Sequence, residues 1–563
     1  MKKTTDLRIK KYISPRLLKT IAFTSLICGS AISNSSGQVN QPGVDDTIYL
    51  QQGWDHHTRQ TLSFTSFGSR YLPYQWFIAL EQFDSEIPFR DHEHMAALGF
   101  IPTAADQYNP DGLPVGVVRD ADKKNGDYVG LTCAACHTGQ VRINGKRIRI
   151  DGGQALINFA QFESATLAAL KATAANTEKF ARFAQQVIVG SAPGNSAETL
   201  TPERLKKQLQ ARIVELEKHL SINATQVPYG HGRLDAFGQI FNAIAVEAIN
   251  MPENIHSPNA PTSYPVLWDA SHLNVVQWNA SAPNKEPGPL FQNAITALAV
   301  YGTISVAKDK LTYQSSIRVS NLGNIQSDFY QLVAPQWPVE IAGALDSTKM
   351  AMGKKIYDEL CLSCHTLVDP TDKKRKLQAV LTPVSEVGTD PLMATNFMQR
   401  KVKTGLLEGD KEMIFFGAEL PAETSPLNLV AHTAAGALFH QPWHTVKAVV
   451  KEFRSQAAPP EQIVYDSYKA RPINGIWASA PYLHNGSVPS IYDLLLPPKQ
   501  RPTGFYVGNI ELDVVKVGHV YSEAPNTSFF DTHLLGNSNA GHEYGTHLSD
   551  DERWQLIEYI KTL

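Results

Sequence analysis

The sequence predicts a mainly α protein with two domains, long irregular loops and insertions. Three observations lead to this fold class. Helical periodicity and capping patterns recur along the 563 residues, stretches dense in proline separate them, and one short cysteine and histidine motif occurs twice, far apart in the chain. Hydrophobic residues make up 43% and charged residues 19%, which is typical of a globular protein.

The repeated motif carries the clearest chemistry. It consists of Cys133, Cys136 and His137, and it returns as Cys361, Cys364 and His365. Covalent haem attachment requires two thiols with two residues between them, for the vinyl groups, and a histidine directly after them to bind iron. A CxxC pair alone is also typical of a redox pair or of half a zinc site. The adjacent histidine and the repetition favour two covalently bound haem c groups.

The N-terminus has the pattern of an export signal. Residues 1–33 begin with seven basic residues, continue with an apolar run from Ile21 to Ile27 and end in small residues, so we expect cleavage near Ser33. The alternatives are a membrane anchor, for which the apolar run is short, and a lipoprotein linked through Cys28, which bulky Ile27 disfavours. The other four cysteines lie in the two motifs, which leaves none for a structural disulfide.

Charge narrows the expected partners. Without residues 1–33 the chain has 44 Lys and Arg against 53 Asp and Glu. Such an acidic balance makes nucleic acid an unexpected partner. We expect a periplasmic or secreted protein with no stable membrane span after signal cleavage.

The elements of the N-terminal half follow in chain order. Residues 53–130 show little helical period and predict an irregular lead-in that wraps the first haem. Residues 155–187 are rich in Ala, Phe and Leu and predict helix. A further helix is expected after Thr201 and Pro202, an N-cap followed by proline. One face of that helix carries Leu205, Leu209, Ile213, Leu216 and Leu220. Residues 251–290, dense in proline, predict a long loop.

A second unit begins near Asp346, which can cap a helix that runs into the second motif. Residues 549–552 form a capping box ahead of a final helix. A first helix that ends in the haem motif and a last helix that packs across it are how cytochrome c domains are built, with residues 366–470 as an insertion. The predicted organisation is a signal peptide at 1–33 and two cytochrome c-type haem domains, at 34–340 and 341–563.

Several segments resemble one family. Residues 480–486 read APYLHNG, residues 109–114 read NPDGLP and residues 537–542 read NSNAGH. With the two haem motifs, they make the chain similar to the bacterial di-haem cytochrome c peroxidase superfamily. The pattern looks closest to its rubber oxygenase and fatty-acid dioxygenase branch. The resemblance implies a reactive haem on His137 and an electron-transfer haem on His365.

The resemblance also implies roles for further residues. Trp278 matches the family's tryptophan between the two haems, and Arg471 takes the place of a basic residue that binds a haem propionate. Thr296 aligns with the position that carries the distal glutamate of the peroxidases. Ser479 and Pro481 fall where the peroxidases bind an inter-haem calcium ion, and serine in place of the usual threonine leaves the presence of this ion open.

The axial ligands are expected to differ between the two haems. No histidine occurs between His137 and His219, so the second histidine that closes the resting reactive haem in the peroxidases is missing. We expect His137 to be the only protein ligand there, in an apolar pocket. For the C-terminal haem we expect His542 as the distal ligand, with His484 or a methionine as alternatives.

Three functions fit these expectations. The favoured function is a haem-dependent oxygenase or oxidase that acts with dioxygen on an apolar unsaturated substrate. The alternative is a cytochrome c peroxidase that reduces hydrogen peroxide with electrons from a small redox protein. The second alternative is an electron-transfer cytochrome c without catalysis. Threonine in place of the acid favours the first, because O–O cleavage depends on a group that moves a proton.

Overall fold

The computed structural model describes residues 46–191, 200–285, 287–308, 310–452 and 465–563. Helices account for 40% and strands for 15%, in agreement with a mainly α fold. Within these residues no helix is long and apolar enough to span a bilayer. The predicted export signal, including Cys28, lies outside the described residues.

The segment before the first motif contains short helices and strands between irregular stretches, so the prediction of an irregular lead-in over residues 53–130 is only partly right. It contains α1 (His56–Phe64), α2 (Tyr74–Ala79), α3 (His92–Ala97), β2 (Leu72–Pro73), β3 (Val117–Asp120) and β4 (Tyr128–Leu131). The strands form one antiparallel sheet in the order β2-β4-β3. Asp55 and Asp91 cap α1 and α3 by accepting backbone N–H groups. These helices are too short to display a hydrophobic period.

Three longer helices follow, namely α5 (Phe159–Ala175), α6 (Thr177–Gly190) and α7 (Pro202–Ile222). The helical run predicted over residues 155–187 is divided at Asn176. This residue ends α5, and its side chain caps α6 by accepting the N–H groups of Glu178 and Lys179. α7 begins as predicted, because the Thr201 hydroxyl accepts the N–H of Arg204.

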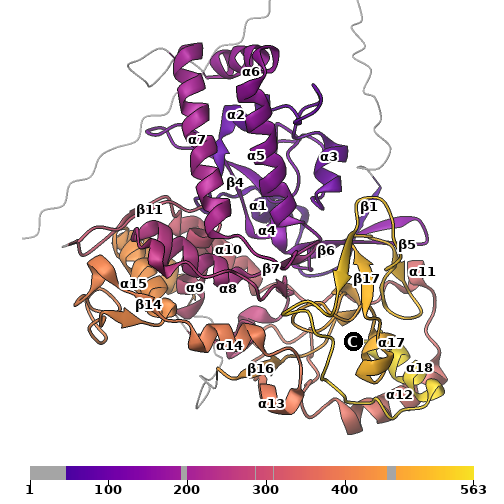
Figure 1. The fold of residues 1–563 in the computed structure, drawn as a ribbon. Coiled ribbons are helices and arrows are strands. Elements are labelled where there is room, and N and C mark those ends of the chain that lie inside the picture. The colour runs from indigo at the N-terminus through magenta and orange to yellow at the C-terminus, as the bar shows by residue number, and fades with distance from the viewer. Residues whose placement is uncertain (1–45, 192–199, 286, 309, 453–464) are drawn as a thin grey trace, which may run out of the picture. The chain divides into compact units, whose positions relative to one another are not determined.

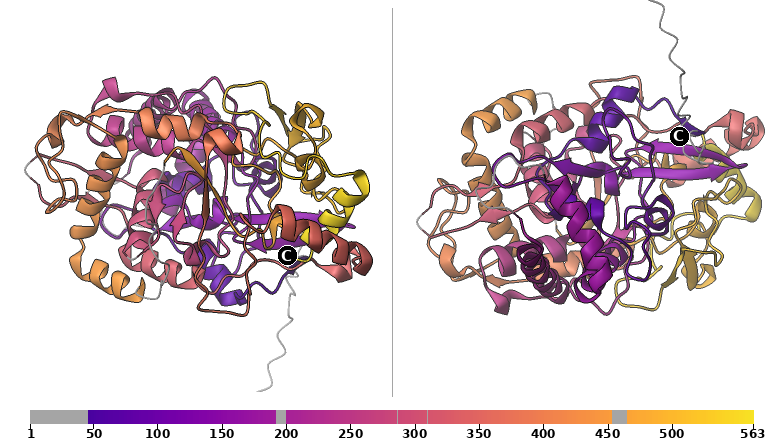
Figure 2. Two further views of the ribbon diagram at one scale, coloured as in Figure 1. Left: turned by 90° about the horizontal axis from the view of Figure 1, so that it is seen from below. Right: turned by 90° about the horizontal axis from the view of Figure 1, so that it is seen from above.

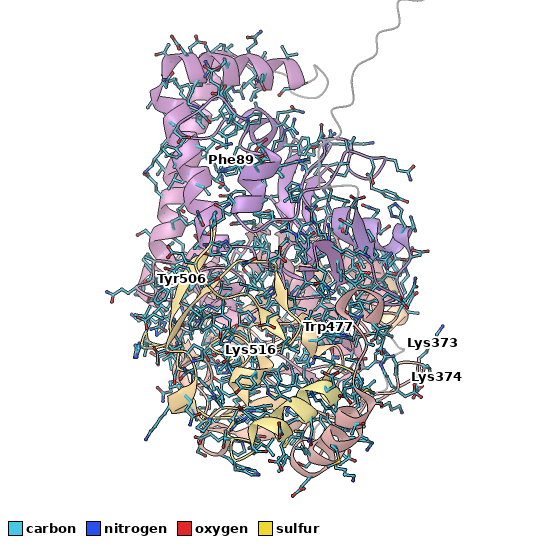
Figure 3. The ribbon with its side chains drawn as sticks, turned by 90° about the vertical axis from the view of Figure 1, so that its right-hand side faces the viewer. Phe89, Lys373, Lys374, Trp477, Tyr506 and Lys516 are labelled. Atoms are coloured by element: carbon cyan, nitrogen blue, oxygen red, sulfur yellow. The ribbon has the colours of Figure 1, made fainter. Side chains whose placement is uncertain are left out.

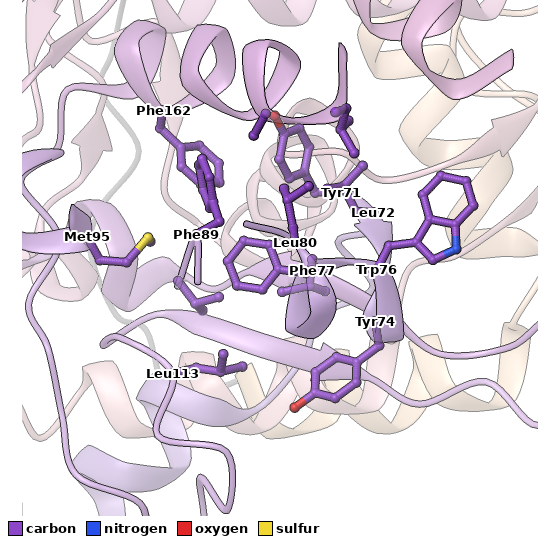
Figure 4. Close-up of a cluster of buried hydrophobic side chains, with 14 of the residues drawn as sticks. Tyr71, Leu72, Tyr74, Trp76, Phe77, Leu80, Phe89, Met95, Leu113 and Phe162 are labelled. Atoms are coloured by element: carbon purple, nitrogen blue, oxygen red, sulfur yellow. The ribbon is translucent and has the colours of Figure 1, made fainter. Parts of the chain in front are cut away.

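An aromatic core joins this helical region to the sheet (Figure 4). The ring of Tyr71 lies 5.2 Å from that of Phe162 on α5, and Phe77 meets Phe89 edge to face at 6.0 Å. Buried aromatic side chains remove large apolar areas from water and therefore dominate such a core. Ala135 of the first motif belongs to the same core, which fixes that motif against the lead-in.

The middle of the chain forms a helical layer with α8 (Ala236–Asn242), the π-helix η1 (Ala243–Ala248), α9 (Gly288–Ala299), α10 (Val319–Phe329), α14 (Leu392–Gln399), α15 (Pro426–Phe439) and α16 (Pro442–Glu452). In Figure 1, α15 lies beside α9 and α8, and these helices are in contact. The loop predicted over residues 251–290 contains only short pieces before α9 begins: η2 (Pro252–Asn254), β8 (Thr262–Ser263), η3 (Ala270–His272), β9 (Val275–Val276) and β10 (Ala282–Pro283).

Short strand pairs connect the remaining segments. They are β7 (Arg233–Leu234) with β8, β9 with β10, β11 (Ile304–Ser305) with β12 (Gln314–Ser315), β13 (Val380–Pro383) with β16 (Ser467–Ala470), β14 (Val402–Lys403) with β15 (Glu423–Thr424), β17 (Gly504–Val507) with β20 (Ser528–Asp531), and β18 (Leu512–Asp513) with β19 (Gly518–His519). The short helices are α11 (Val339–Ala342), α13 (Val384–Val387), η4 (Gly405–Leu407), η5 (Ile476–Ala478), α17 (Ile491–Leu494) and η6 (Pro498–Gln500).

Two helices frame the second motif. α12 (Ser347–Leu360) is capped by Asp346 and α18 (Asp550–Ile560) begins with a capping box, both as predicted. They pack against each other beside the C-terminus (Figure 1). Their closest approach is at Gly353, where an added Cβ would lie 1.9 Å from the backbone oxygen of Gln555. Only glycine permits this distance.

A second core contains residues from both halves of the chain. β6 (Lys146–Asp151) pairs with β5 (Thr138–Ile143) and, in parallel, with β1 (Thr47–Tyr49). Ile148 of this sheet belongs to the same buried cluster as Trp477 and Ile557. Figure 2 shows the β5 and β6 arrows reaching the yellow C-terminal segments, where Arg142 forms an ion pair with Glu511 at 2.7 Å. The division at residue 340 stays a prediction, because residues 43–563 group as one compact unit.

Figure 3 contrasts the interior and the surface of this part of the chain. Trp477 has no exposed surface, and its indole N–H donates to the carbonyl of Pro335 at 2.9 Å. Lys373 and Lys374, between the second motif and β13, extend into solvent. A buried indole with a satisfied N–H fixes the C-terminal segment against residues that precede α12.

Candidate haem-binding site

The first motif forms a single helical turn, α4 (Cys133–Cys136). Thr132 caps it, because its hydroxyl accepts the N–H of Ala134. Both thiols are free and half-buried. Burial raises the pKa of the Cys133 thiol to about 11, and burial with the nearby Cys133 raises that of Cys136 to about 12. The two sulfurs are therefore held together in an apolar setting that suits thioethers.

His137 is oriented by the backbone. Its Nδ1 lies 2.8 Å from the carbonyl oxygen of Pro265, in the predicted loop. Burial lowers the pKa of His137 to about 4 although this hydrogen bond opposes the shift, so the imidazole is neutral. Nδ1–H donates to the carbonyl, and Nε2 keeps its lone pair. This is the arrangement of a histidine that binds a metal and is held by a second group.

The second motif repeats this arrangement. His365 Nδ1 lies 2.7 Å from the carbonyl oxygen of Arg471, and burial lowers the pKa of this histidine too. The hydroxyl of Tyr357, on α12, donates to the carbonyl of His365 at 2.6 Å. Nε2 of His365 is therefore also available. The two motifs, distant in sequence, therefore share one arrangement, in which the histidine Nδ1 donates to a backbone carbonyl oxygen.

A cavity of about 210 Å³ adjoins the first motif and is lined by Cys133, Cys136 and His137. Thr296, on α9, faces it, and apolar side chains cover much of its wall, including Phe67, Leu131, Val266, Leu273, Val300 and Phe329. Among the described residues that line it, none is acidic and His137 is the only histidine. Thr296 and His137 therefore both line the cavity, whose described lining contains no carboxylate.

Two buried cations also line the cavity. Lys469 Nζ donates to the carbonyl of Gln277 at 2.8 Å, and Arg471 donates to two backbone carbonyls. Neither forms an ion pair with a carboxylate of the described residues. Burial and the charge of Arg471 lower the pKa of Lys469 to about 7, and burial lowers that of Arg471 to about 10. Such cations call for a negative group in the cavity.

His542 lies close to His365 of the second motif. The ring centres of His365 and His542 are 6.3 Å apart. Two imidazoles that share one metal ion have centres about 6 Å apart, because each metal–nitrogen bond is about 2 Å and the nitrogen lies about 1 Å from its ring centre. Nδ1 of His542 is buried without a hydrogen-bond partner. The pKa of His542 is lowered to about 3, mainly by burial and to a smaller extent by the neighbouring His365 and Arg501. The alternative ligand, His484, instead stacks on Tyr468 at 4.1 Å.

Trp278, Ser479 and the predicted calcium site remain to be placed. Trp278 is half-buried, and its indole N–H donates to the carbonyl of Ser263 at 3.1 Å. Lys469 lies 6.0 Å from the centre of its ring. The Ser479 hydroxyl donates to a backbone carbonyl. The described residues contain no cluster of three His, Cys, Asp or Glu suited to a metal ion, and calcium stays a prediction.

These groups fit haem c at both motifs. Each motif supplies two thiols and a neutral histidine with Nε2 available, and the first cavity supplies two cations for the propionate groups that a haem carries. Sequence reasoning missed Lys469 and Pro265. The sequence does offer a signal for Lys469. Alternate residues of a strand face the same side, and Lys469 in β16 lies two residues before Arg471, which directly follows the strand. No feature of the sequence marks the Pro265 carbonyl as a partner of His137.

Comparison with known proteins supports a cytochrome. Residues 467–506, which include Lys469 and Arg471, match the family model described as RoxA-like, cytochrome c-like. Over 585 aligned residues the chain is 33% identical to the uncharacterized protein y4iJ of Sinorhizobium fredii, which covers 93% of this chain and 94% of that protein. It is 23% identical to y4iM of the same organism over 60% of this chain and 73% of that protein. The chain belongs to the same family as y4iJ and is a RoxA-related c-type cytochrome.

Proposed function

We propose that the protein is a di-haem oxygenase or oxidase that acts with dioxygen on an apolar unsaturated substrate, such as an unsaturated fatty acid or polyisoprene. The observation that carries the proposal is the cavity beside His137, whose walls are largely apolar and whose described lining contains no acidic side chain. Cys133, Cys136 and His137 would hold a haem there, and its iron would supply dioxygen chemistry, because the described lining offers no second histidine.

The side chains of the cavity favour this reaction over peroxide cleavage. Phe67, Leu131, Val300 and Phe329 offer apolar contact to a hydrocarbon chain and exclude water. Peroxide cleavage gains about 10²- to 10⁴-fold from a positioned acid or base. Thr296 occupies that place, and a hydroxyl with an ordinary pKa far above neutrality moves protons poorly.

The second motif supports a different role. His365 and His542, whose ring centres are 6.3 Å apart, would both bind the iron of a haem there, which suits electron transfer rather than substrate binding. Half-buried Trp278 and the loop beside it lie near the first cavity, and we assign this tryptophan to electron exchange between the two sites. A small redox protein is the expected outside partner.

We also propose that the chain matures outside the cytoplasm, in the periplasm, after cleavage of residues 1–33. Covalent haem attachment in bacteria is completed there. An N-terminal sequence of the purified protein that starts near residue 34 would support export, and a chain that still begins at Met1 would contradict it.

The test compares two reactions on the purified reduced protein. We expect one carbon monoxide bound per chain, oxygen uptake with polyisoprene or an unsaturated fatty acid, and slow peroxide reduction with a reduced cytochrome. Thr296→Glu should raise peroxide reduction, and Thr296→Val, which keeps the size but no acid, should not. Rapid peroxide turnover without oxygen uptake on any alkene would establish the peroxidase instead. No carbon monoxide binding would establish a plain electron carrier.

A further inference from the structure

A series of hydrogen bonds joins the two proximal histidines, and Arg471 is its central member. His137 donates to the carbonyl of Pro265 at 2.8 Å, and the next carbonyl, that of Val266, accepts from Arg471 Nη1 at 2.9 Å. The backbone carbonyl of Arg471 itself accepts from His365 at 2.7 Å. One residue therefore contacts the support of the first histidine through its side chain and the second histidine through its backbone.

Arg471 is one of the groups that hold the segment supporting His137. Residues 265–268 belong to a long loop with little regular structure, and they need contacts from elsewhere to place the Pro265 carbonyl. Arg471 Nη2 donates to the carbonyl of Trp268 at 2.6 Å, so the guanidinium spans two carbonyls of the loop. The indole of Trp268 donates to the carbonyl of Asn474 at 2.8 Å, which fixes the loop to the same C-terminal segment.

No carboxylate of the described residues forms an ion pair with Arg471. Asp269 is the nearest acidic group that favours its charged form, but that carboxylate forms a buried ion pair with Arg375 at 2.7 Å. A guanidinium remains charged in proteins. In a buried, weakly polar setting its field reaches both histidines with little screening.

We propose that Arg471 is a positioning residue shared by both haem sites, which sets the orientation of His137 and His365 together and adds one positive charge to both. The inference rests on haem binding at both motifs, as proposed above, and it goes beyond a contact with one propionate. A histidine held by a carbonyl is a stronger and better oriented iron ligand, so the two haems should respond together to a change at this side chain.

The structure provides a matched control two residues away. Lys469 is also a buried cation that lines the first cavity, but its contacts are with the Gln277 carbonyl and the Trp278 ring. Within the described part of the chain, its ammonium group makes no hydrogen bond to His365 or to residues 265–268, which support His137. Measured below pH 7, where Lys469 carries its charge, removal of that charge should act on the first haem alone.

The experiment measures the midpoint potentials of both haems and the electron paramagnetic resonance of the oxidised protein. Arg471→Met should lower both potentials, because a positive charge disfavours the oxidised iron, and should shift the low-spin signal of the C-terminal haem. Arg471→Lys keeps the charge but cannot span two carbonyls. It should leave the potentials nearly unchanged and still alter the iron–histidine stretch of the first haem in resonance Raman spectra.

Lys469→Met should lower only the potential of the first haem. A shift of a single haem in Arg471→Met, or equal shifts of both haems in Lys469→Met, would overturn the shared role. If Arg471→Met does not fold, the test rests on Arg471→Lys. An unchanged iron–histidine stretch of the first haem in that variant would contradict the proposal. Failure of either motif to attach haem would instead refute the proposed function. Mass spectrometry of the denatured protein detects this failure separately from any change in potential.

Discussion

The contact between α12 and α18 allows a prediction with a definite sign. In an exposed helix, Gly→Ala stabilises by about 1 kcal/mol, because alanine loses less backbone entropy. At Gly353 the new methyl group would lie 1.9 Å from the backbone oxygen of Gln555 and 2.9 Å from Cβ of Tyr559. A backbone atom cannot rotate away, so the two helices must separate. Overpacking costs up to about 3 kcal/mol, which leaves a net loss of about 2 kcal/mol.

Native-state hydrogen exchange measures this loss where it occurs. A loss of about 2 kcal/mol corresponds to about 30-fold lower protection of the α18 amide groups, if the helix opens as a local unit. Ala351→Gly, on the exposed side of the same helix, is the control and should lower protection through helix propensity alone, by about 1 kcal/mol. Higher protection in Gly353→Ala, with an unchanged haem spectrum, would refute the packing argument.

Three further predictions follow. The denatured protein should exceed its polypeptide mass by two haems, and a smaller excess would contradict dual attachment. His542→Ala should convert one low-spin haem signal into a high-spin one, whereas an unchanged spectrum would exclude this ligand. Burial lowers the pKa of His219, but hydrogen bonds to Glu163 and Glu247 together outweigh this effect and raise the pKa to about 10. Since this exceeds the ordinary value of 6.5, His219 contributes stability that is fully present below pH 6.5 and is lost as the pH rises through about 10. His219→Gln should abolish that dependence in urea unfolding, and an unchanged pH profile would contradict it.

The parts predicted well are those set by local chemistry. Asp346, Thr201 and the capping box at residues 549–552 act within one helical turn, so a single sequence shows them. The two CxxCH motifs are local for the same reason, and haem attachment at each of them stays a prediction. The short helices of residues 53–130 were missed because their apolar faces are completed by residues distant in the chain, which periodicity does not detect.

The supports of the site could not be predicted because they are backbone groups brought in from far away. Pro265 lies 128 residues from His137, and Arg471 lies 106 residues from His365. A carbonyl oxygen is present at every residue, so no residue type marks the ones that act. Arg471 was expected at a propionate, and only the fold reveals its contacts with Val266 and Trp268.

The core that joins both halves of the chain has a consequence for assembly. Cys133 packs against the cluster that contains Trp477 and Ile557, both from the C-terminal half of the chain. This cluster is complete only when the two halves have folded together. If haem is attached at the first motif, as proposed, the thiols must react before the cluster encloses them.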